Sequence, residues 1–162
     1  AISVALERDG AIVAGVVYDF IKDEMFIAEK GQGAFLNNRR IRVSARRSPP
    51  EALIGTGIPH IGKGGHVESQ REIAQAMLTF QNVRRMGAAA LDLAYVACGR
   101  FDGFWERKLN SWDIAAGALI VRESGGYVSD MDGSDFTIDT RDVCAGNEPI
   151  HAALLAALKK AR

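Results

Sequence analysis

The feature that most constrains the fold is a change in hydrophobic pattern at Ser48-Pro49-Pro50. Before this break, apolar and polar residues alternate with the period of a half-buried strand. After it, short apolar strands alternate with segments of helical period. Strands followed by a strand–helix alternation predict a layered α/β or α+β arrangement. We therefore expect residues 1–48 to supply strands of an N-terminal sheet, and residues 49–162 to form a C-terminal α/β domain.

The pattern also places the individual elements. In the first region we expect strands at residues 2–7, 12–20, 24–29 and 41–43. In the second we expect strands at residues 53–56, 101–105, 127–129 and 142–145. Helices are predicted at residues 67–80, 88–98 and 113–123, with a last one opened by Pro149. No helix follows Gly31-x-Gly33, which therefore indicates a turn and not a phosphate loop.

Charge and composition argue against several classes of function. Twenty basic residues balance twenty acidic ones, so no net field favours nucleic acid or an anionic membrane. No apolar run approaches the ~20 residues of a membrane-spanning helix, and no signal peptide is recognisable. We expect a cytoplasmic protein in which Cys98 and Cys144, both in apolar runs, are buried reduced thiols. The chain opens directly on a strand, so we also expect further residues upstream of Ala1.

The densest group of candidate site residues surrounds Asp113, in the sequence Trp112-Asp113-Ile114-Ala115-Ala116-Gly117. Asp113 falls in the first turn of a predicted helix. Spacing alone favours a helix cap there, because an aspartate satisfies orphan N–H groups and offsets the dipole. The alternative is a metal ligand, since a carboxylate fixed at a helix start is rigidly aimed and Mg²⁺ needs oxygen ligands in fixed places. Ala115, Ala116 and Gly117 would let other backbone pack closely behind it.

Two further candidates lie at other strand–helix junctions. Glu106 ends a predicted strand; it is either a surface residue or an acceptor for the hydroxyls of a polyol. Arg84 and Arg85 precede a helix that starts through Gly87, Ala88 and Ala89. The two arginines are either a basic pair on the surface or part of an anion site, in which the free N–H groups of the helix start also take part. Gly55-Thr56-Gly57 allows a similarly close backbone approach. Three weak signals at such junctions carry more weight than one.

Other kinds of catalysis have little support in the sequence. His60, His66 and His151 show no metal-ligand spacing and are interpreted as structural or surface residues. There is no Gly-x-Ser-x-Gly elbow and no Cys–His pairing, so serine or cysteine nucleophiles are not indicated. We assign no catalytic nucleophile within the chain.

A long motif resembles the second signature of the inositol monophosphatase family. It runs from Leu109 to Gly126, as LNSWDIAAGALIVRESGG. The similarity covers essentially the whole chain, and is closest to the bacterial extragenic-suppressor type. The segments that agree with this type include GTGIP from Gly55, RMGAAALDLA from Arg85, DGFWE from Asp102 and AGN from Ala145.

The resemblance implies the sugar phosphatase fold, with helices and sheets in alternating layers, and a Mg²⁺-dependent phosphatase that acts as a homodimer. It makes Asp113 a ligand of the metal and a contact of the inositol hydroxyls, Glu106 a hydroxyl contact and Ala89 a backbone contact. Arg84 and Arg85 fall in a region that family members use to bind substrate or to form the subunit interface, and the resemblance does not say which arginine has which role. Metal ions would clamp the phosphate and activate a water that attacks phosphorus.

The family's first signature, Asp-Pro-x-Asp-Gly-Thr-x-Asn, does not occur in this sequence. In the family it lies a short way upstream of the strand that matches residues 2–7, and it supplies further metal ligands. The resemblance therefore implies an incomplete first sheet, a metal site located mostly upstream of Ala1, and a chain that is inactive alone.

The expected substrate is inositol 1-phosphate. Histidinol phosphate, fructose 1,6-bisphosphate and 3′-phosphonucleotides stay open, because relatives that act on them share the Trp-Asp helix. Extragenic-suppressor members are also linked to the transcription machinery, so a protein-interaction role with RNA polymerase or transcription factors is the alternative of a different class. Near-zero net charge argues against direct nucleic-acid binding but not against a protein partner.

Overall fold

The first part of the chain is an antiparallel meander. The computed structural model is described for residues 1–161. Five strands pair in chain order: β1 (Ile2–Arg8), β2 (Ala11–Asp19), β3 (Glu24–Glu29), β4 (Gly33–Leu36) and β5 (Arg39–Arg40). Two of the hairpins turn on residue pairs with positive φ, Asp9-Gly10 and Asn37-Asn38. Such pairs match the twist of the flanking strands, so the meander follows from local turn chemistry.

The end of this sheet differs from the sequence prediction. No strand was expected at Gly33–Leu36, and the predicted strand at residues 41–43 does not form. Asn37-Asn38 instead folds β5 back onto β4. Beyond it the extended chain makes single hydrogen bonds, from the Ile41 N–H to Ala34 O at 2.9 Å and from the Val43 N–H to Ser124 O at 3.1 Å. The segment therefore bridges from the sheet to a helix end and does not extend the sheet.

The second sheet is mixed. Its order is β7-β6-β8-β10-β9, built from β6 (Leu53–Thr56), β7 (Asn82–Arg84), β8 (Gly103–Glu106), β9 (Tyr127–Ser129) and β10 (Val143–Gly146). β6 runs parallel to β7 and β8, whereas β10 is antiparallel to β8 and β9. Four of these strands match the prediction to within two residues, and β7 was not predicted.

Four α-helices accompany the second sheet and all four were predicted. They are α1 (His66–Thr79), α2 (Ala89–Ala97), α3 (Ser111–Glu123) and α4 (Glu148–Lys160). A short 3₁₀ turn, η1 (Pro49–Glu51), precedes β6. α3 begins two residues earlier than expected, because Asn110 forms its cap.

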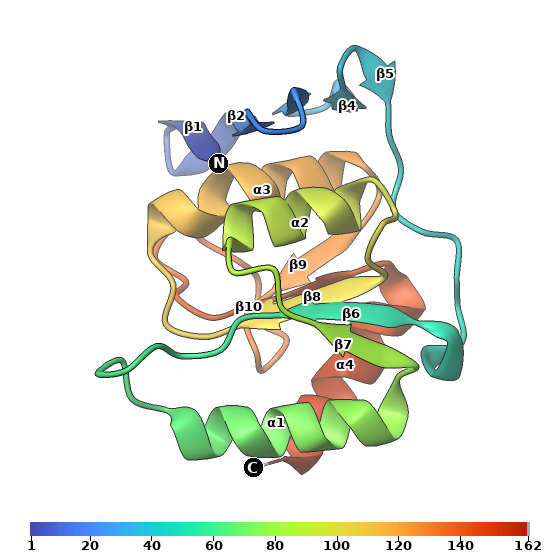
Figure 1. Ribbon diagram of the computed structural model, residues 1–162. Coiled ribbons are helices and arrows are strands. Elements are labelled where there is room, and N and C mark those ends of the chain that lie inside the picture. The colour runs from blue at the N-terminus through green and yellow to red at the C-terminus, as the bar shows by residue number, and fades with distance from the viewer. Residues whose placement is uncertain (162) are drawn as a thin grey trace.

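The elements stack in four layers (Figure 1). The first sheet lies on α2 and α3, these helices lie on the second sheet, and α1 and α4 cover the opposite face of that sheet. The alternation of sheets and helices is the arrangement that the family resemblance implied. The two sheets are joined by residues 41–52, which include the predicted domain boundary; the division into two domains stays a prediction.

Small residues bring the layers unusually close. A Cβ placed on Gly15 of β2 would lie 3.0 Å from the Cα of Ala116 in α3. A Cβ placed on Gly117 would lie 2.6 Å from the Cβ of Leu93 in α2. The expected close backbone packing is therefore confirmed for Ala116, against β2, whereas Gly117 makes room for the Leu93 side chain of α2.

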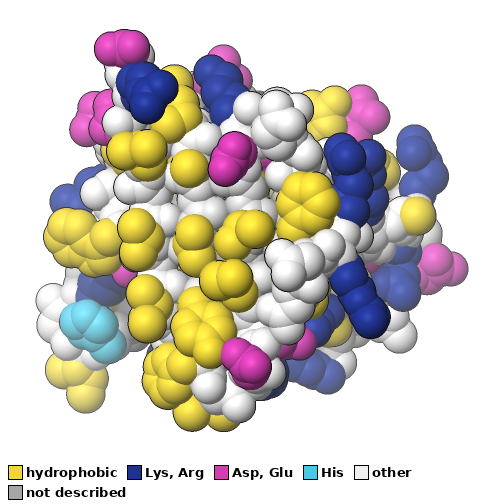
Figure 2. All heavy atoms as spheres, turned by 90° about the horizontal axis from the view of Figure 1, so that it is seen from above, with side chains coloured by type: hydrophobic (Ala, Val, Ile, Leu, Met, Phe, Trp, Pro, Cys, Tyr) yellow, Lys and Arg dark blue, Asp and Glu magenta, His cyan; other side chains and the backbone are white. Residues whose placement is uncertain are grey.

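The outer face of the first sheet is apolar and open. Ile2, Val4 and Leu6 of β1 are each more than half exposed, and Met25 of β3 is 41% exposed. Figure 2, which looks onto this side of the molecule, shows hydrophobic side chains spread across it. This outer face is therefore uncovered in the part of the chain that the structure describes. Exposed apolar patches of this kind mark interaction surfaces.

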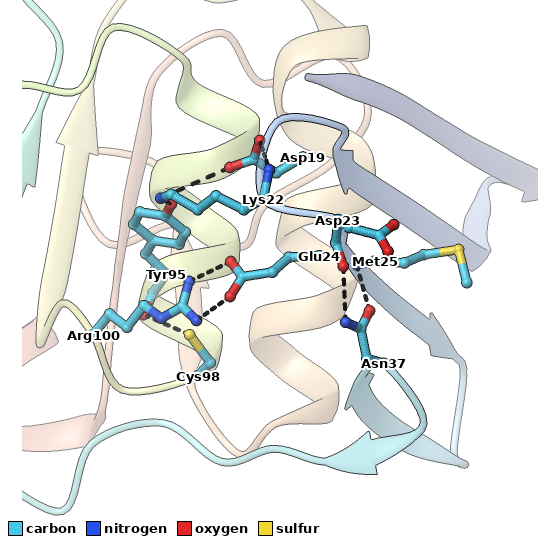
Figure 3. Close-up of polar contacts among 9 residues, drawn as sticks. All are labelled: Asp19, Lys22, Asp23, Glu24, Met25, Asn37, Tyr95, Cys98 and Arg100. Carbon is cyan, nitrogen blue, oxygen red and sulfur yellow. Dashed lines mark hydrogen bonds and ion pairs between the residues drawn. The ribbon is translucent and has the colours of Figure 1, made fainter.

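A polar cluster ties the first sheet to α2 (Figure 3). The Tyr95 ring of α2 lies between two cations, with Lys22 Nζ 4.8 Å and Arg100 Cζ 4.9 Å from its centroid. Lys22 also donates to the Tyr95 hydroxyl. Arg100 binds both carboxylate oxygens of Glu24 at 2.6 Å, and Glu24 begins β3. Because a paired guanidinium and a cation–π contact reinforce one another here, the sheet is anchored at this corner.

Two simpler predictions can be compared directly with the structure. Cys144 is buried, and burial raises the pKa of its thiol. Cys98 is only partly buried, so the expectation of two buried thiols is wrong for this residue, which follows α2 at its exposed end. Among residues 1–161, no helix is both long and apolar enough to cross a membrane.

Candidate functional site

Asp113 lies in the first turn of α3, as predicted, and both interpretations of it find support in the geometry. Its Oδ2 accepts a hydrogen bond of 2.9 Å from the Asn110 N–H, as part of a capping box. The other oxygen, Oδ1, makes no hydrogen bond within residues 1–161. The side chain lines an open depression, together with His60, Lys63, Lys108, Asn110, Arg141 and Asp142. The cap therefore fixes the carboxylate and leaves one oxygen available to a ligand.

Glu106 lies at the end of β8 and is held against the loop that follows β6. A Cβ on Gly57 would lie 1.9 Å from Glu106 Cδ, so only glycine leaves room for this carboxyl. Lys63 Nζ lies 3.9 Å from Glu106 Oε1. Burial raises the Glu106 pKa; the charge of Asp113 adds to this effect, and those of Lys63 and Arg85 oppose it. The sequence predicted that Gly55-Thr56-Gly57 allows a close approach to the backbone. At Gly57, the group that makes this approach is the Glu106 carboxyl of the protein itself.

The two carboxylates occupy neighbouring depressions that share two cations. Lys63 and Lys108 line the depression that holds Glu106 as well as the one that holds Asp113. The loop after β6 and the starts of α2 and α3 lie at the same end of the layers in Figure 1. We expected Gly87, Ala88 and Ala89 to line the same cleft. They line neither depression in the described part of the chain, although Ala89 is the first residue of α2.

The structure separates the two arginines that the sequence could not. Arg84 ends β7 and turns back, donating to Asn82 Oδ1 and, at 3.1 Å, to Val83 O. The charge of Arg85 instead acts on the carboxyls of Glu106 and Asp92. Arg85 is therefore the one whose charge reaches the candidate site, at the entrance to α2.

Asp92 is a buried carboxyl that the sequence analysis did not identify. It lies in the first turn of α2 with 0% of its surface exposed. Neither carboxylate oxygen has a hydrogen-bond partner among the described residues. Burial, and to a lesser degree the charge of Glu106, raises its pKa to about 7. The only signal in the sequence was an acid within a helix that is otherwise apolar.

A buried ionic network supports the strand end that carries Glu106. Glu72 of α1 is buried and accepts from Trp105 Nε1 at 3.1 Å and from Arg107 Nε at 2.7 Å. Arg107 also donates to Asp142 at 2.8 Å. The residues on either side of Glu106 are thus held from α1 and from the loop before β10. Sequence reasoning missed this network because its members lie far apart along the chain.

The described residues contain no group of three or more histidine, cysteine or acidic side chains that could hold a metal ion. The free Oδ1 of Asp113 fits one Mg²⁺ ligand, and Mg²⁺ needs several oxygen ligands in octahedral geometry. Among residues 1–161, Oδ1 of Asp113 is therefore a single candidate oxygen ligand.

Comparisons with known proteins identify the family of the chain. Residues 1–162 match the inositol monophosphatase family. The chain is 54% identical to an inositol-1-monophosphatase of Mesorhizobium japonicum over 99% of its own length and 60% of the relative's. It is 43% identical to the Nus factor SuhB of Pseudomonas aeruginosa, covering 98% of this chain and 59% of that protein.

Solved structures show the same fold. The extragenic suppressor protein SuhB from Bartonella henselae superposes with a TM-score of 0.93 at 52% identity, covering 98% of this chain and 60% of that one. An inositol monophosphatase from Anabaena gives a TM-score of 0.88 at 37% identity, covering 98% of this chain and 65% of that one. The chain thus spans about 60% of the length of the first two of these curated relatives and of SuhB from Bartonella.

Proposed function

The chain belongs to the inositol monophosphatase family, and on that premise we propose that it supplies the substrate-binding half of a Mg²⁺-dependent phosphatase. The reaction is the hydrolysis of inositol 1-phosphate to inositol and phosphate. The observation that carries the proposal is the pairing of Asp113 and Glu106 in neighbouring depressions lined by the same two lysines. Fixed carboxylates beside cations suit a ligand that has both hydroxyls and a phosphate.

Each residue has a role that its surroundings support. Asp113, fixed through Oδ2, offers Oδ1 to Mg²⁺. When bound, Mg²⁺ supplies charge stabilisation and lowers the pKa of a water. Glu106, placed by Gly57, accepts hydrogen bonds from substrate hydroxyls. The N-terminal N–H groups of α2 at Ala89, with the charge of Arg85, attract the anionic substrate.

The proposed activity requires more carboxylates than this chain provides. Residues 1–161 hold no three-ligand group, and the sequence contains no Asp-Pro-x-Asp-Gly-Thr signature. We therefore assign turnover to an extended protein, defined as this chain preceded by a segment that carries that signature. The 162-residue chain alone is expected to be inactive.

A substrate panel tests the specificity. The extended protein should release phosphate from inositol 1-phosphate faster than from histidinol phosphate, fructose 1,6-bisphosphate or a 3′-phosphonucleotide. Turnover should depend on added Mg²⁺ and fall on chelation. A clear preference for another phosphate ester would keep the chemistry but replace the substrate, and no phosphate release from any ester would refute the proposed function.

A role in transcription is the second candidate, because the chain is 43% identical to the Nus factor SuhB of Pseudomonas aeruginosa. A pull-down of RNA polymerase with the tagged extended protein tests it, with a tagged unrelated protein of similar charge as control. Retention of polymerase only by the extended protein supports this role. Equal recovery in both samples counts against it.

The resemblance also leads us to expect that the extended protein is a homodimer and that it is located in the cytoplasm. Analytical ultracentrifugation of the extended protein tests the first. Fractionation of cells that express it tests the second. A monomer over the whole working concentration range, or recovery with membranes, would contradict the corresponding expectation.

A further inference from the structure

Two aspartates that are both almost fully buried have opposite surroundings. Asp102 is 1% exposed; both its oxygens accept from Arg46 Nη1, at 3.0 and 2.8 Å, and its Oδ2 also accepts from the Leu53 N–H at 2.7 Å. Asp92 is 0% exposed and neither of its oxygens has a hydrogen-bond partner within residues 1–161. Buried carboxylates are nearly always paired, so the second case needs a physical explanation.

The groups around Asp92 do not provide an ionic partner. Glu106 of β8 acts on it with a charge of the same sign. Arg85, from the turn before α2, and the backbone of Ala88 at the helix start oppose that effect. Arg85 makes no hydrogen bond to the carboxyl, and the weak contact from the Ala88 backbone N–H does not meet hydrogen-bond geometry. Desolvation is the largest influence, and it disfavours the charged form.

We propose that Asp92 is a positioning residue of the site, which carries a proton while neighbouring Glu106 stays ionised. The protonated carboxyl removes a negative charge that would act on Glu106, and so leaves that carboxylate able to accept hydrogen bonds from substrate hydroxyls. Asp92 does not itself reach the substrate, because it has no exposed surface. The inference rests on the proposed function for its effect on substrate, but the protonation of Asp92 is testable in this chain alone.

The proton on Asp92 has a defined consequence for stability. Its pKa is raised on folding, from an ordinary 3.8 to about 7. The folded state therefore binds the proton more tightly than the unfolded state does. The contribution of Asp92 to stability is therefore fully present below about pH 4, falls as the pH rises from there to about 7, and falls no further above that.

The first experiment follows this titration by ¹³C NMR of the 162-residue chain labelled at its aspartate carboxyl carbons, with Asp92→Asn to assign the signal. We expect one carboxyl to titrate near neutral pH, and to vanish in the variant. In Glu106→Gln the same signal should titrate at lower pH, because the like charge has gone. Absence of any aspartate signal titrating above about pH 5.5, more than a unit over the ordinary value, overturns the proposal. An Asp92 titration midpoint that is the same in the wild type and in Glu106→Gln also overturns the proposal.

Urea unfolding gives an independent readout with Asp102→Asn as the matched buried control. Between about pH 5 and pH 8, the unfolding constant of the wild type should rise roughly tenfold or more relative to that of Asp92→Asn. Asp102→Asn should be less stable than the wild type at both pH values, since it disrupts existing bonds. Identical pH dependence of wild type and Asp92→Asn overturns the proposal. If Asp92→Asn does not fold, the comparison of the NMR titrations of the wild type and of Glu106→Gln decides.

The effect on substrate is measured with the extended protein. Between pH 6 and pH 8, roughly one unit on either side of the Asp92 pKa, KM for inositol 1-phosphate should rise in the wild type. In Asp92→Asn it should stay flat, with kcat following the same pH profile in both. A KM profile that the variant does not change refutes the positioning role. Lack of turnover by the wild type refutes the proposed function instead, and leaves the titration to decide on the proton.

Discussion

The Glu106 carboxyl rests directly on Gly57: a Cβ on that glycine would lie 1.9 Å from Glu106 Cδ and 2.2 Å from each of its oxygens. The end of β8 and the loop after β6 are therefore fitted to one another, and the position of the carboxylate depends on the absence of a side chain.

Gly57→Ala should displace Glu106 and weaken substrate binding. The loss of a hydrogen bond to a charged acceptor, about 1.5–3 kcal/mol, corresponds to a rise in KM of roughly tenfold or more in the extended protein. Steady-state kinetics measure it. In a Glu106→Ala background the clash is absent, so adding Gly57→Ala should change KM little. An equal rise in both backgrounds would show that Gly57 acts independently of Glu106.

Asp113 can be dissected because its two oxygens differ. Asp113→Asn can retain the cap through its amide oxygen but loses the charge, so stability should change little while activity of the extended protein falls to background. Asp113→Ala should lose activity and also about 1 kcal/mol of stability. Urea unfolding and phosphate release separate the two effects. Full activity of Asp113→Asn would contradict a metal-ligand role.

Glu72→Ala should destabilise the chain by about 3–5 kcal/mol, because it leaves Arg107 and the Trp105 N–H without their buried acceptor. Glu68 also contacts Arg107, at 3.5 Å, but its side chain is 46% exposed. Glu68→Ala is therefore the matched control, with an expected loss below about 1 kcal/mol. Chemical unfolding followed by Trp fluorescence measures both variants. Similar losses would mean that the network does not depend on its buried member.

The anchor in Figure 3 makes a further prediction about stability. Tyr95→Phe should cost about 1 kcal/mol, since only the bond from Lys22 is lost. Tyr95→Ala should cost about 3–5 kcal/mol because it also removes a buried ring. Thermal unfolding checks both, with half-exposed Tyr127→Phe as control. If Tyr95→Phe loses no more stability than the control, the Tyr95 hydroxyl does not contribute to this anchor.

Much of the fold was predictable because its signals are local. The helical period predicted all four helices, and glycine or asparagine turns explain the meander. β7 escaped prediction because it has only three residues, two of them polar and exposed. The strand expected at residues 41–43 does not form because the local Asn37-Asn38 hairpin already pairs β4 with β5.

The candidate site was predictable only in part. A motif placed Asp113 at a helix start, and the strand pattern placed Glu106 at a strand end. The burial of Asp92, the contact of Glu72 with Trp105 and Arg107, and the different directions of Arg84 and Arg85 all depend on packing between distant segments. No periodicity in the sequence encodes these.

We propose that this chain holds only part of a Mg²⁺-dependent phosphatase site. Its most direct test is phosphate release from inositol 1-phosphate with Mg²⁺ in excess, comparing the 162-residue chain with the extended protein. One carboxylate holds Mg²⁺ weakly, and each ~1.4 kcal/mol of lost transition-state stabilisation is a factor of ten in rate. We expect turnover by the extended protein and only background phosphate release by the 162-residue chain. Comparable turnover by both would place the catalytic ligands within these 162 residues and contradict the assignment of the site.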